Sequence, residues 1–356
     1  MMSIPKFSNI PNSFHSELKR RISQYFEEVG RSTTGEYKIF IKAVILMVAF
    51  VFIYIHLVFF TPIVVVAILE CVLLGIVVSS IGFNVMHDGS HGTFSKYKWL
   101  NKFAALSLNI LGGNSFMWKM KHVVIHHAYT NVDGVDDDIN AGPLLRLAAT
   151  QKKYRLHKYQ HIYFGFLYSL LYIFWIFVSD YKKYFAGKIG SVPLKKMSLA
   201  DHLSFWGFKM LHLLLFIGLP IYVLGFTPWL IGFLVFALVA GFVLSIVFQL
   251  AHTVEHTAFP VADIDTNRLE DEWAIHQIRT TANFATRNKM ISWFVGGLNF
   301  QIEHHLFPKI SHVHYPAISK IIKKACADYG ISYIEYPKMI MAVQSHVNYL
   351  RQLGRG

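Results

Sequence analysis

The chain has 356 residues, of which 54% are hydrophobic, 15% are aromatic and 15% are charged, and its formal net charge is +13. With a mean hydropathy of +0.38, this composition excludes an ordinary soluble enzyme and indicates a membrane protein that forms one integrated domain. The only two cysteines, Cys71 and Cys326, exclude a disulfide framework, a zinc finger and an iron–sulfur cluster.

The first 38 residues contain the segment NSFHSELKRRISQYFEEVG, which predicts an amphipathic helix on the cytoplasmic surface. The extreme N-terminus lacks the apolar core of a secretory signal, so we expect no cleaved signal peptide. Residues 1–38 are therefore expected to form a cytoplasmic segment in front of the membrane domain.

Four apolar segments are long enough to cross the hydrocarbon core of a bilayer, which takes about 20 residues of helix. They cover residues 43–60, 63–86, 210–226 and 229–251. A Thr-Pro dipeptide separates the two members of each pair, so we predict an all-α integral membrane protein whose four transmembrane helices form two hairpins. Glu70 is the one carboxylate deep inside a span, and we expect it to bond to a neighbouring helix.

Two further apolar stretches, residues 103–113 and 162–178, are ambiguous. The first is too short to cross a bilayer. The second is rich in aromatic residues and has three lysines on each side, which places both its ends on the cytoplasmic side under the positive-inside rule. We predict that it is an interfacial helix. Anionic headgroups then account for the basic charge, and the absence of a basic recognition helix argues against nucleic-acid binding.

Four short motifs hold nine of the nineteen histidines. In chain order these motifs are HDGSH, HVVIHH, HTVEH and QIEHH, and their histidines are His87, His91, His122, His126, His127, His252, His256, His304 and His305. The first and third motifs begin where the second and fourth apolar segments end. We therefore predict that the motifs meet at the cytoplasmic mouth of the bundle, in a helical cap that holds metal.

Histidines four residues apart lie on one face of a helix, with Cβ atoms roughly 5 to 6 Å apart. The motifs give three such pairs, His87 with His91, His122 with His126, and His252 with His256. Adjacent histidines differ by about 100° around a helix, so a doubled histidine can serve two ions. Nine nitrogen donors exceed the roughly four ligands of a zinc site. We therefore predict a dinuclear centre, although imidazole suits zinc, copper, iron and nickel alike.

The remaining histidines are weaker candidates, because a single histidine often fills a polar gap in a membrane protein. We expect His56 and His212 to be isolated polar residues in apolar segments. Loop or surface positions are expected for His15, His157, His161, His202 and His346. His276, His312 and His314 are candidates for residues that contact the metal ligands without binding the metal.

A histidine-bound redox centre at a membrane surface suits oxygen activation. Two ferrous ions can supply electrons to O2, and neutral imidazole ligands leave such a centre oxidising. A lipid chain can enter from between the spans, with its target carbons in a dry tunnel that controls the access of water.

The segments around the motifs resemble those of the membrane fatty acid desaturases. These segments are HDGSH, WKMKHVVIHHAYTNVDGVDDDI, EWAIHQIRTTANF and GGLNFQIEHHLFP. The glutamine that opens the last box is similar to that of the front-end and linoleoyl-CoA-type branch. The resemblance implies two iron ions, O2 and two electrons, used to place a cis double bond in an acyl chain carried on a phospholipid or on CoA.

The resemblance also implies roles for individual residues. The first, second and third boxes match His87 and His91, then His122, His126 and His127, then Gln301, His304 and His305. Related stearoyl-type enzymes have an extra iron-binding histidine where this chain has His256, and a polar, water-mediated ligand where it has His252. Gln301 is either a weak ligand or a donor to His305. Gln277 and Asn283 match family positions and are expected to support the ligands.

Many front-end relatives carry a fused cytochrome b5 domain marked by the sequence HPGG, which this sequence lacks. Electrons are then expected from a separate ferredoxin or cytochrome b5, attracted by the basic cytoplasmic face. We expect a cytoplasmic segment at residues 1–38, a desaturase domain at 39–330 and a cytoplasmic tail at 331–356. The protein is expected in a bacterial cytoplasmic membrane, with its site on the cytoplasmic side.

Three other functions fit parts of the sequence. A histidine-box hydroxylase of alkanes, sterols or carotenoids shares the metal site but inserts oxygen into the substrate. A metal or haem carrier would place histidines opposite one another within the spans. A metalloprotease would need HExxH, whereas HTVEH has its glutamate beside the second histidine.

Overall fold

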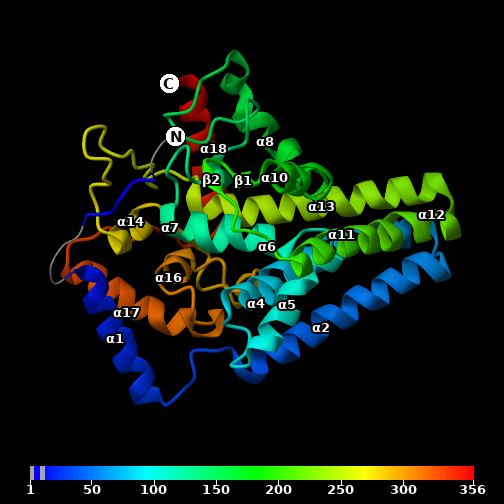
Figure 1. The fold of residues 1–356 in the computed structure, drawn as a ribbon, viewed down its shortest axis with the longest axis horizontal. Coiled ribbons are helices and arrows are strands. Elements are labelled where there is room, and N and C mark those ends of the chain that lie inside the picture. Colours follow the sequence, from blue (N-terminus) through cyan, green and yellow to red (C-terminus); the bar gives the residue numbers. More distant parts are fainter. Residues whose placement is uncertain (1–3, 9–12) are drawn as a thin grey trace.

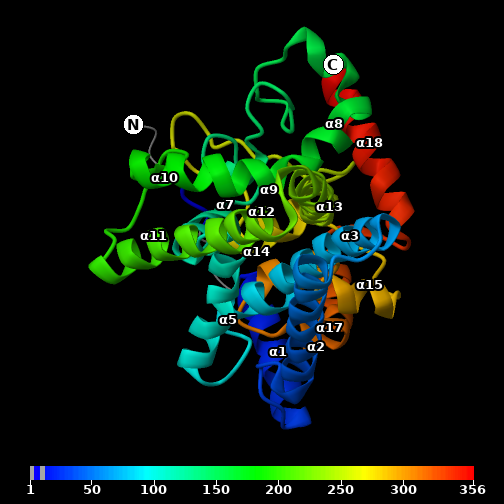
Figure 2. The same ribbon diagram turned by 90° about the vertical axis from the view of Figure 1, so that its right-hand side faces the viewer.

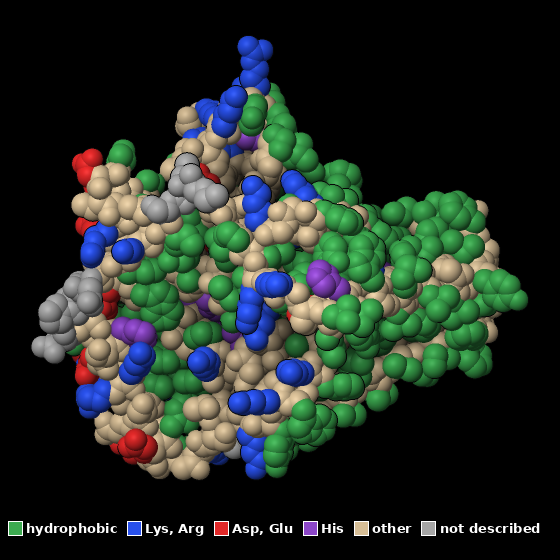
Figure 3. All heavy atoms as spheres, in the orientation of Figure 1, with side chains coloured by type: hydrophobic (Ala, Val, Ile, Leu, Met, Phe, Trp, Pro, Cys, Tyr) green, Lys and Arg blue, Asp and Glu red, His purple; other side chains and the backbone are tan. Residues whose placement is uncertain are grey.

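The computed structural model of the chain describes residues 4–8 and 13–356. Within these residues, four helices are long and apolar enough to cross a membrane, namely Tyr37–Phe60, Val64–His91, Leu199–Leu224 and Phe226–His252. They extend together from one end of the molecule as two hairpins (Figure 1). Hydrophobic side chains cover that end, whereas lysines and arginines gather over the remainder of the face in Figure 3. The predicted all-α membrane fold with four spans is confirmed.

Three of the four spans combine several helical segments. The first joins α2 (Glu36–Ile55) to the π-helix η1 (His56–Phe60), and the second joins α3 (Val64–Ile81), the π-helix η2 (Gly82–Met86) and α4 (His87–His91). The third joins α11 (Leu199–Leu213), the π-helix η7 (Leu214–Gly218) and α12 (Leu219–Leu224), and the fourth is α13 (Phe226–His252). The backbone between spans turns at positive φ, 41° at Thr61 and 83° at Gly225.

Three of the four spans begin earlier than their apolar segments, at Tyr37, Leu199 and Phe226. The third starts at Leu199 because Ser198 and Asp201 form a capping box, in which each side chain bonds the other's backbone N–H. Hydropathy alone misses this part because it contains Lys209. The structure buries Lys209, whose Nζ lies 2.9 Å from Oδ2 of Asp180 and 2.6 Å from the carbonyl oxygen of Gly112. This ion pair ties the third span to the predicted interfacial segment.

The predicted interfacial segment is a bent helical unit. It contains the 3-10 helix η5 (Arg155–Tyr159), α8 (Gln160–Ser169), α9 (Leu171–Phe174), the π-helix η6 (Trp175–Ser179) and α10 (Asp180–Ala186). Its two halves meet at 58°, and it counts as a further span only if the bent pair is taken as one. Figure 2, seen from the end of the hairpins, shows α8 and α18 projecting beyond α13. The location of this bent unit in the membrane interface stays a prediction.

The remaining helices form a cap over the other end of the spans. They are α1 (Phe14–Val29), α5 (Lys98–Ile110), α6 (Ser115–Trp118), η3 (Lys119–His126), α7 (His127–Tyr129), η4 (Asp137–Ile139), α14 (Trp273–Arg279), α15 (Lys289–Phe294), α16 (Gln301–Leu306), η8 (His312–His314), α17 (Tyr315–Asp328) and α18 (Met339–Arg355). Strand β1 (Lys188–Ile189) pairs antiparallel with β2 (Val192–Pro193), and β3 (Asn283–Phe284) pairs parallel with β4 (Glu335–Tyr336).

Both ends of the chain pack into this cap. Helix α1 realises the predicted N-terminal amphipathic helix, and it buries Phe14, Leu18 and Ile22 in a core shared with α14 and α17. Residues 1–3 and 9–12 of the predicted segment lie outside the described residues. Strand β4 and helix α18 also pack against the membrane domain, while the three-part division of the chain stays a prediction.

Several histidines outside the motifs are more buried than expected. His157 is buried and lies 2.9 Å from the carbonyl oxygen of Pro143, and His346 is buried between Tyr168 and Thr253. The surface positions predicted for these two are therefore wrong, because each ring joins two segments that are distant in sequence. The prediction for Glu70 is confirmed, since its Oε1 lies 2.8 Å from Nδ1 of His56 on the neighbouring span.

Helix α13 packs closely against the bent unit through Gly241. A Cβ atom at Gly241 would lie 2.1 Å from the carbonyl oxygen of Ser169, whereas a Cβ at Gly207 on α11 would meet nothing within 4 Å. We expect Gly241→Ala to lower the free energy of unfolding by about 1–3 kcal/mol through overpacking. Gly207→Ala should leave it unchanged or raise it by up to about 1 kcal/mol. Thermal unfolding in detergent measures both, and equal effects would contradict this packing.

Candidate metal centre

The four histidine motifs meet where the spans enter the cap. His87 and His91 lie on α4, the last turns of the second span, and His252 is the last residue of the fourth span. The second and third boxes lie on η3, α7 and α16 in the cap. Segments separated by more than 200 residues thus form one buried site.

The histidines divide into two groups in which one ring nitrogen of each residue lies within 4.8 Å of the others. The first group contains His87, His91, His122 and His304, and the second contains His126, His252 and His305. His127 lies between the groups, with its ring centroid 4.5 Å from that of His304 and 4.4 Å from that of His305. The adjacent histidines of the second and third boxes are thereby shared between two sites.

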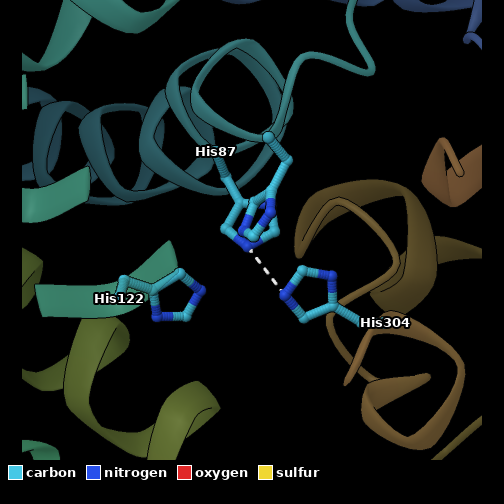
Figure 4. Close-up of side chains that lie close together, drawn as sticks. His87, His122 and His304 are labelled. Atoms are coloured by element: carbon cyan, nitrogen blue, oxygen red, sulfur yellow. Dashed lines mark hydrogen bonds between the residues drawn. The ribbon is translucent and has the colours of Figure 1, made fainter. Parts of the chain in front are cut away.

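Pairs of ring nitrogens approach one another closely in the first group. Nε2 of His87 lies 3.1 Å from Nε2 of His304, and Figure 4 shows these two rings meeting from α4 and α16 with His122 facing the same space from η3. Nε2 of His122 lies 3.2 Å from Nε2 of His127. Two nitrogens bound to one ion at roughly 2.0–2.1 Å and at right angles lie about 2.9 Å apart. The observed spacings suit neighbouring ligands of a shared ion.

The second box departs from the α-helical pairing expected from its sequence. Residues Lys119–His126 form a π-helix, in which backbone hydrogen bonds join residues five apart. His122 therefore meets His127, five residues later, through their Nε2 atoms, while His126 turns to His252 and His305. His122 and His126 share a further grouping only with Asp138.

His256 lies outside both groups, so its predicted place beside His252 is wrong. Helix α13 ends at His252, and His256 is exposed with a φ of 76°. The turn after His252 instead binds α18. The backbone N–H of Glu255 donates to Oγ of Ser345 at 2.9 Å, and the hydroxyl of Tyr336 donates to the carbonyl oxygen of Glu255 at 2.7 Å.

Outer partners hold the Nδ1 side of several rings. Nδ1 of His126 lies 2.9 Å from Oδ2 of Asp136, and Nδ1 of His304 lies 3.0 Å from the hydroxyl of Tyr315. Because a carboxylate can only accept hydrogen bonds, the proton of the His126 ring lies on Nδ1 and is donated in a hydrogen bond to Asp136. Nε2 of His126 then has a free lone pair that can bind metal. The sequence did not single out Asp136 or Tyr315, and the only signal was the acidic loop that follows the second box.

The predicted supporting residues take different positions. Oε1 of Gln277 lies 2.9 Å from Nδ1 of His305 and accepts a hydrogen bond from Thr130. Asn283 instead fixes helix α16, since its Oδ1 accepts from the backbone N–H of Ile302 at 2.9 Å. Gln301 is buried, and its Oε1 has no hydrogen-bond partner among the described residues.

Among the three histidines considered for a supporting role, His312 reaches a residue of the first box. Its Nδ1 lies 3.0 Å from Oδ2 of Asp88. His276 packs edge-on against Phe7, and His314 packs against Phe26.

Burial sets the charge of the clustered rings. Burial and the neighbouring histidines lower the pKa of His122, His127, His304 and His305 well below its ordinary value. Burial also opposes the charge on His126, but Asp136 and Asp138 outweigh it and raise its pKa. Most of the rings are therefore neutral at neutral pH, which is the form that binds metal.

The unpartnered nitrogens provide a direct test of whether these residues fit a metal. Nε2 of His91, His126, His252 and His305 is buried and has no hydrogen-bond partner in the described part of the chain. Buried polar atoms normally have partners, so neutral imidazoles with several free lone pairs in a common space fit bound cations. The nitrogen-only donor set suits iron, zinc or copper and does not suit magnesium or calcium.

Comparison with known proteins agrees with this site. The model of the fatty acid desaturase family matches residues 61–337. The chain is 34% identical over 342 residues to the sn-1 linoleoyl-lipid 6-desaturase of Arthrospira platensis, covering 96% of this chain and 92% of that protein. It is 35% identical to the protein of the same name in Synechocystis sp., covering 96% of both chains. It is 34% identical to the acyl-lipid (8-3)-desaturase of Physcomitrium patens, covering 72% of that protein.

The fold and the site define a multi-pass membrane oxidoreductase with a buried polyhistidine centre. The chain belongs to the fatty acid desaturase family. It uses O2 to introduce a double bond into a fatty acyl chain, and the family resemblance predicted from the sequence is confirmed.

The carboxylate of Asp136 should matter for metal affinity although it lies outside both groups. We expect Asp136→Asn to weaken the binding of a divalent transition metal such as Co²⁺ by about 10- to 100-fold, because His126 loses its charged partner. Asp133→Asn in the same loop is the control, since Asp133 bonds to Thr150 and Gln151. Titration of the metal-free protein measures both affinities, and equal values would contradict the role of Asp136.

Proposed function

We propose that the two histidine groups bind two iron ions. His87, His91, His122 and His304 would hold one ion, and His126, His252 and His305 would hold the other, with His127 between them. The free Nε2 atoms in the second group and the close nitrogen pairs in the first are the observations that carry this proposal.

Bound iron would supply the redox chemistry that lets O2 remove hydrogen from an unactivated C–H bond. In the overall reaction one –CH2–CH2– unit, O2, two electrons and two protons become –CH=CH– and two molecules of water. The chain orients the ligands for this reaction. Asp136 accepts a hydrogen bond from Nδ1 of His126, and Gln277 faces Nδ1 of His305. Burial keeps bulk water from the rings.

The substrate is proposed to be an acyl chain of a membrane lipid. Two relatives that match nearly the whole of this chain are named sn-1 linoleoyl-lipid 6-desaturases, and the moss relative is named an acyl-lipid (8-3)-desaturase. The site lies where the spans enter the cap, so an acyl tail can reach it from the bilayer. We infer attack near the carboxyl end of a polyunsaturated chain, at C6 in the first instance.

Electrons are proposed to come from a separate acidic carrier, a ferredoxin or a cytochrome b5. Lysines and arginines gather on the cap face in Figure 3. Among the exposed lysines of the cap are Lys98 and Lys102 on α5 and Lys119 on η3. Positive charge around the cap attracts an acidic partner and steers its approach. Under the positive-inside rule, this positive charge also places the cap on the cytoplasmic side of the membrane. The membrane is proposed to be a bacterial cytoplasmic membrane.

Product analysis tests the proposed substrate and position. The chain is expressed in a bacterial host with simple lipids, supplied with linoleate and an electron carrier, and the acyl chains are mapped by mass spectrometry. We expect a new cis double bond at C6 of lipid-bound linoleate. Hydroxylated chains without a new double bond would contradict the reaction, and a new bond elsewhere would contradict the position.

His305 and His256 were both predicted to bind metal, but only His305 lies in one of the two groups. Their alanine variants therefore form a matched pair. We expect His305→Ala to lose iron and desaturation together while the protein still inserts into the membrane. His256→Ala should keep both at the level of the unaltered chain, since His256 is exposed outside both groups. Iron per chain and lipid products are measured on the same membranes. Desaturation by His305→Ala, or loss of iron in His256→Ala, would refute this ligand set.

A further inference from the structure

The first span carries a buried lysine close to the first histidine group. Lys42 on α2 is only 8% exposed. Its Nζ lies 2.7 Å from Oδ1 of Asn84, 2.9 Å from the carbonyl oxygen of Trp293 and 3.1 Å from Nε2 of His312. A lysine ammonium has three N–H donors and no acceptor, so these three contacts use all of its hydrogens.

These contacts fix the protonation of His312. Because the ammonium of Lys42 only donates, Nε2 of His312 accepts and its proton lies on Nδ1. Nδ1 then donates to Oδ2 of Asp88 at 3.0 Å, and Ser311 donates to the same oxygen at 3.3 Å. Lys42, His312 and Asp88 thus form a buried chain of hydrogen bonds with one direction.

The chain of hydrogen bonds ends beside His87. Oδ1 of Asp88 lies 3.6 Å from Nδ1 of His87, and Nε2 of the same ring lies 3.1 Å from Nε2 of His304. At this distance the buried carboxylate acts through its charge, which favours a proton on Nδ1 and leaves Nε2 as the lone pair facing His304. Lys42 balances the carboxylate, since a buried charge without compensation is strongly unfavourable.

We propose that Lys42 is a positioning residue for the metal ion held by the first histidine group, acting on His87 through His312 and Asp88. This inference rests on the proposed binding of iron by His87. The second group has its own outer partners, Asp136 at His126 and Gln277 at His305. Lys42 therefore controls one of the two sites selectively.

The test compares Lys42→Met with Lys38→Met. Methionine keeps the unbranched apolar part of the lysine side chain and removes its charge and donors. Lys38 is an exposed lysine about one turn earlier on the same helix. Ferrous iron is titrated into the metal-free full chain in nanodiscs against a competing chelator, and ⁵⁷Fe Mössbauer spectra follow the two sites. We expect Lys42→Met to weaken one site by about 10- to 100-fold, so that iron falls from two ions per chain toward one. Lys38→Met should match the unaltered chain.

A second set of variants separates positioning from general damage. Asp88→Asn removes the charge that Lys42 balances, so the losses in Lys42→Met and Asp88→Asn should not add in the double variant. His312→Leu removes both the acceptor for Lys42 and the donor to Asp88, and it should weaken the same site even if Lys42→Met fails to fold.

The outcomes distinguish this inference from the proposed function. Two tightly bound irons in Lys42→Met, parallel weakening of both sites, or additive losses would overturn the role of Lys42 and leave the two-iron centre standing. An unaltered chain that desaturates lipid without two bound irons would overturn the metal centre itself.

Discussion

The structure depends on burying neutral imidazoles whose lone pairs face one another. His87 and His304 meet through two nitrogens 3.1 Å apart, as do His122 and His127 at 3.2 Å, and none of these contacts is favourable unless a proton or a cation lies between them. The helices around the site must therefore be held in place by other interactions. Those interactions come from the spans, the bent unit and α18, and a metal can then use an arrangement that the protein has already formed.

The outer contacts of the site tie it to every layer of the fold. Asp136 contacts His126 from the acidic loop, and Tyr315 contacts His304 from α17. Lys42, in the opening turns of the first span, is linked to the first box through His312. The turn after His252 is bound by α18. Asp136 and Tyr315 lie only 10 and 11 residues from the histidines that they contact, whereas Lys42 and α18 come from segments far away in the sequence. The orientation of the ligands therefore depends on both near and distant segments.

Segments of π-helix determine which histidines belong to each of the two groups. The π-helix at Lys119–His126 pairs His122 with His127 instead of His126. A second π-helix, Gly82–Met86, directly precedes His87 within the second span and sets the direction of α4 at the end of that span. Such segments are common at functional sites. They depend on packing around the whole helix, and for that reason the spacing of histidines along the chain does not reveal them.

The class of the protein follows from local patterns in the amino-acid sequence. Long apolar segments can satisfy their backbone polar groups in lipid only as helices, and histidine motifs with adjacent ring pairs predicted two sites at the ends of spans. Local patterns of this kind require no knowledge of distant neighbours. They also led to His256, because a four-residue spacing carries meaning only while the helix continues, and here it ends at His252.

Which ring nitrogens face the common space, and which polar residues contact the other side of each ring, depends on how the helices pack together. Asp136, Tyr315 and Lys42 lie outside the histidine motifs, and Lys42 directly precedes the first apolar segment with no local pattern that sets it apart. Its role becomes visible only when the first span, the first box and the loop before α17 are packed together. Burial removes water as the alternative partner for these groups, and their hydrogen bonds then depend on long-range packing that no local pattern contains.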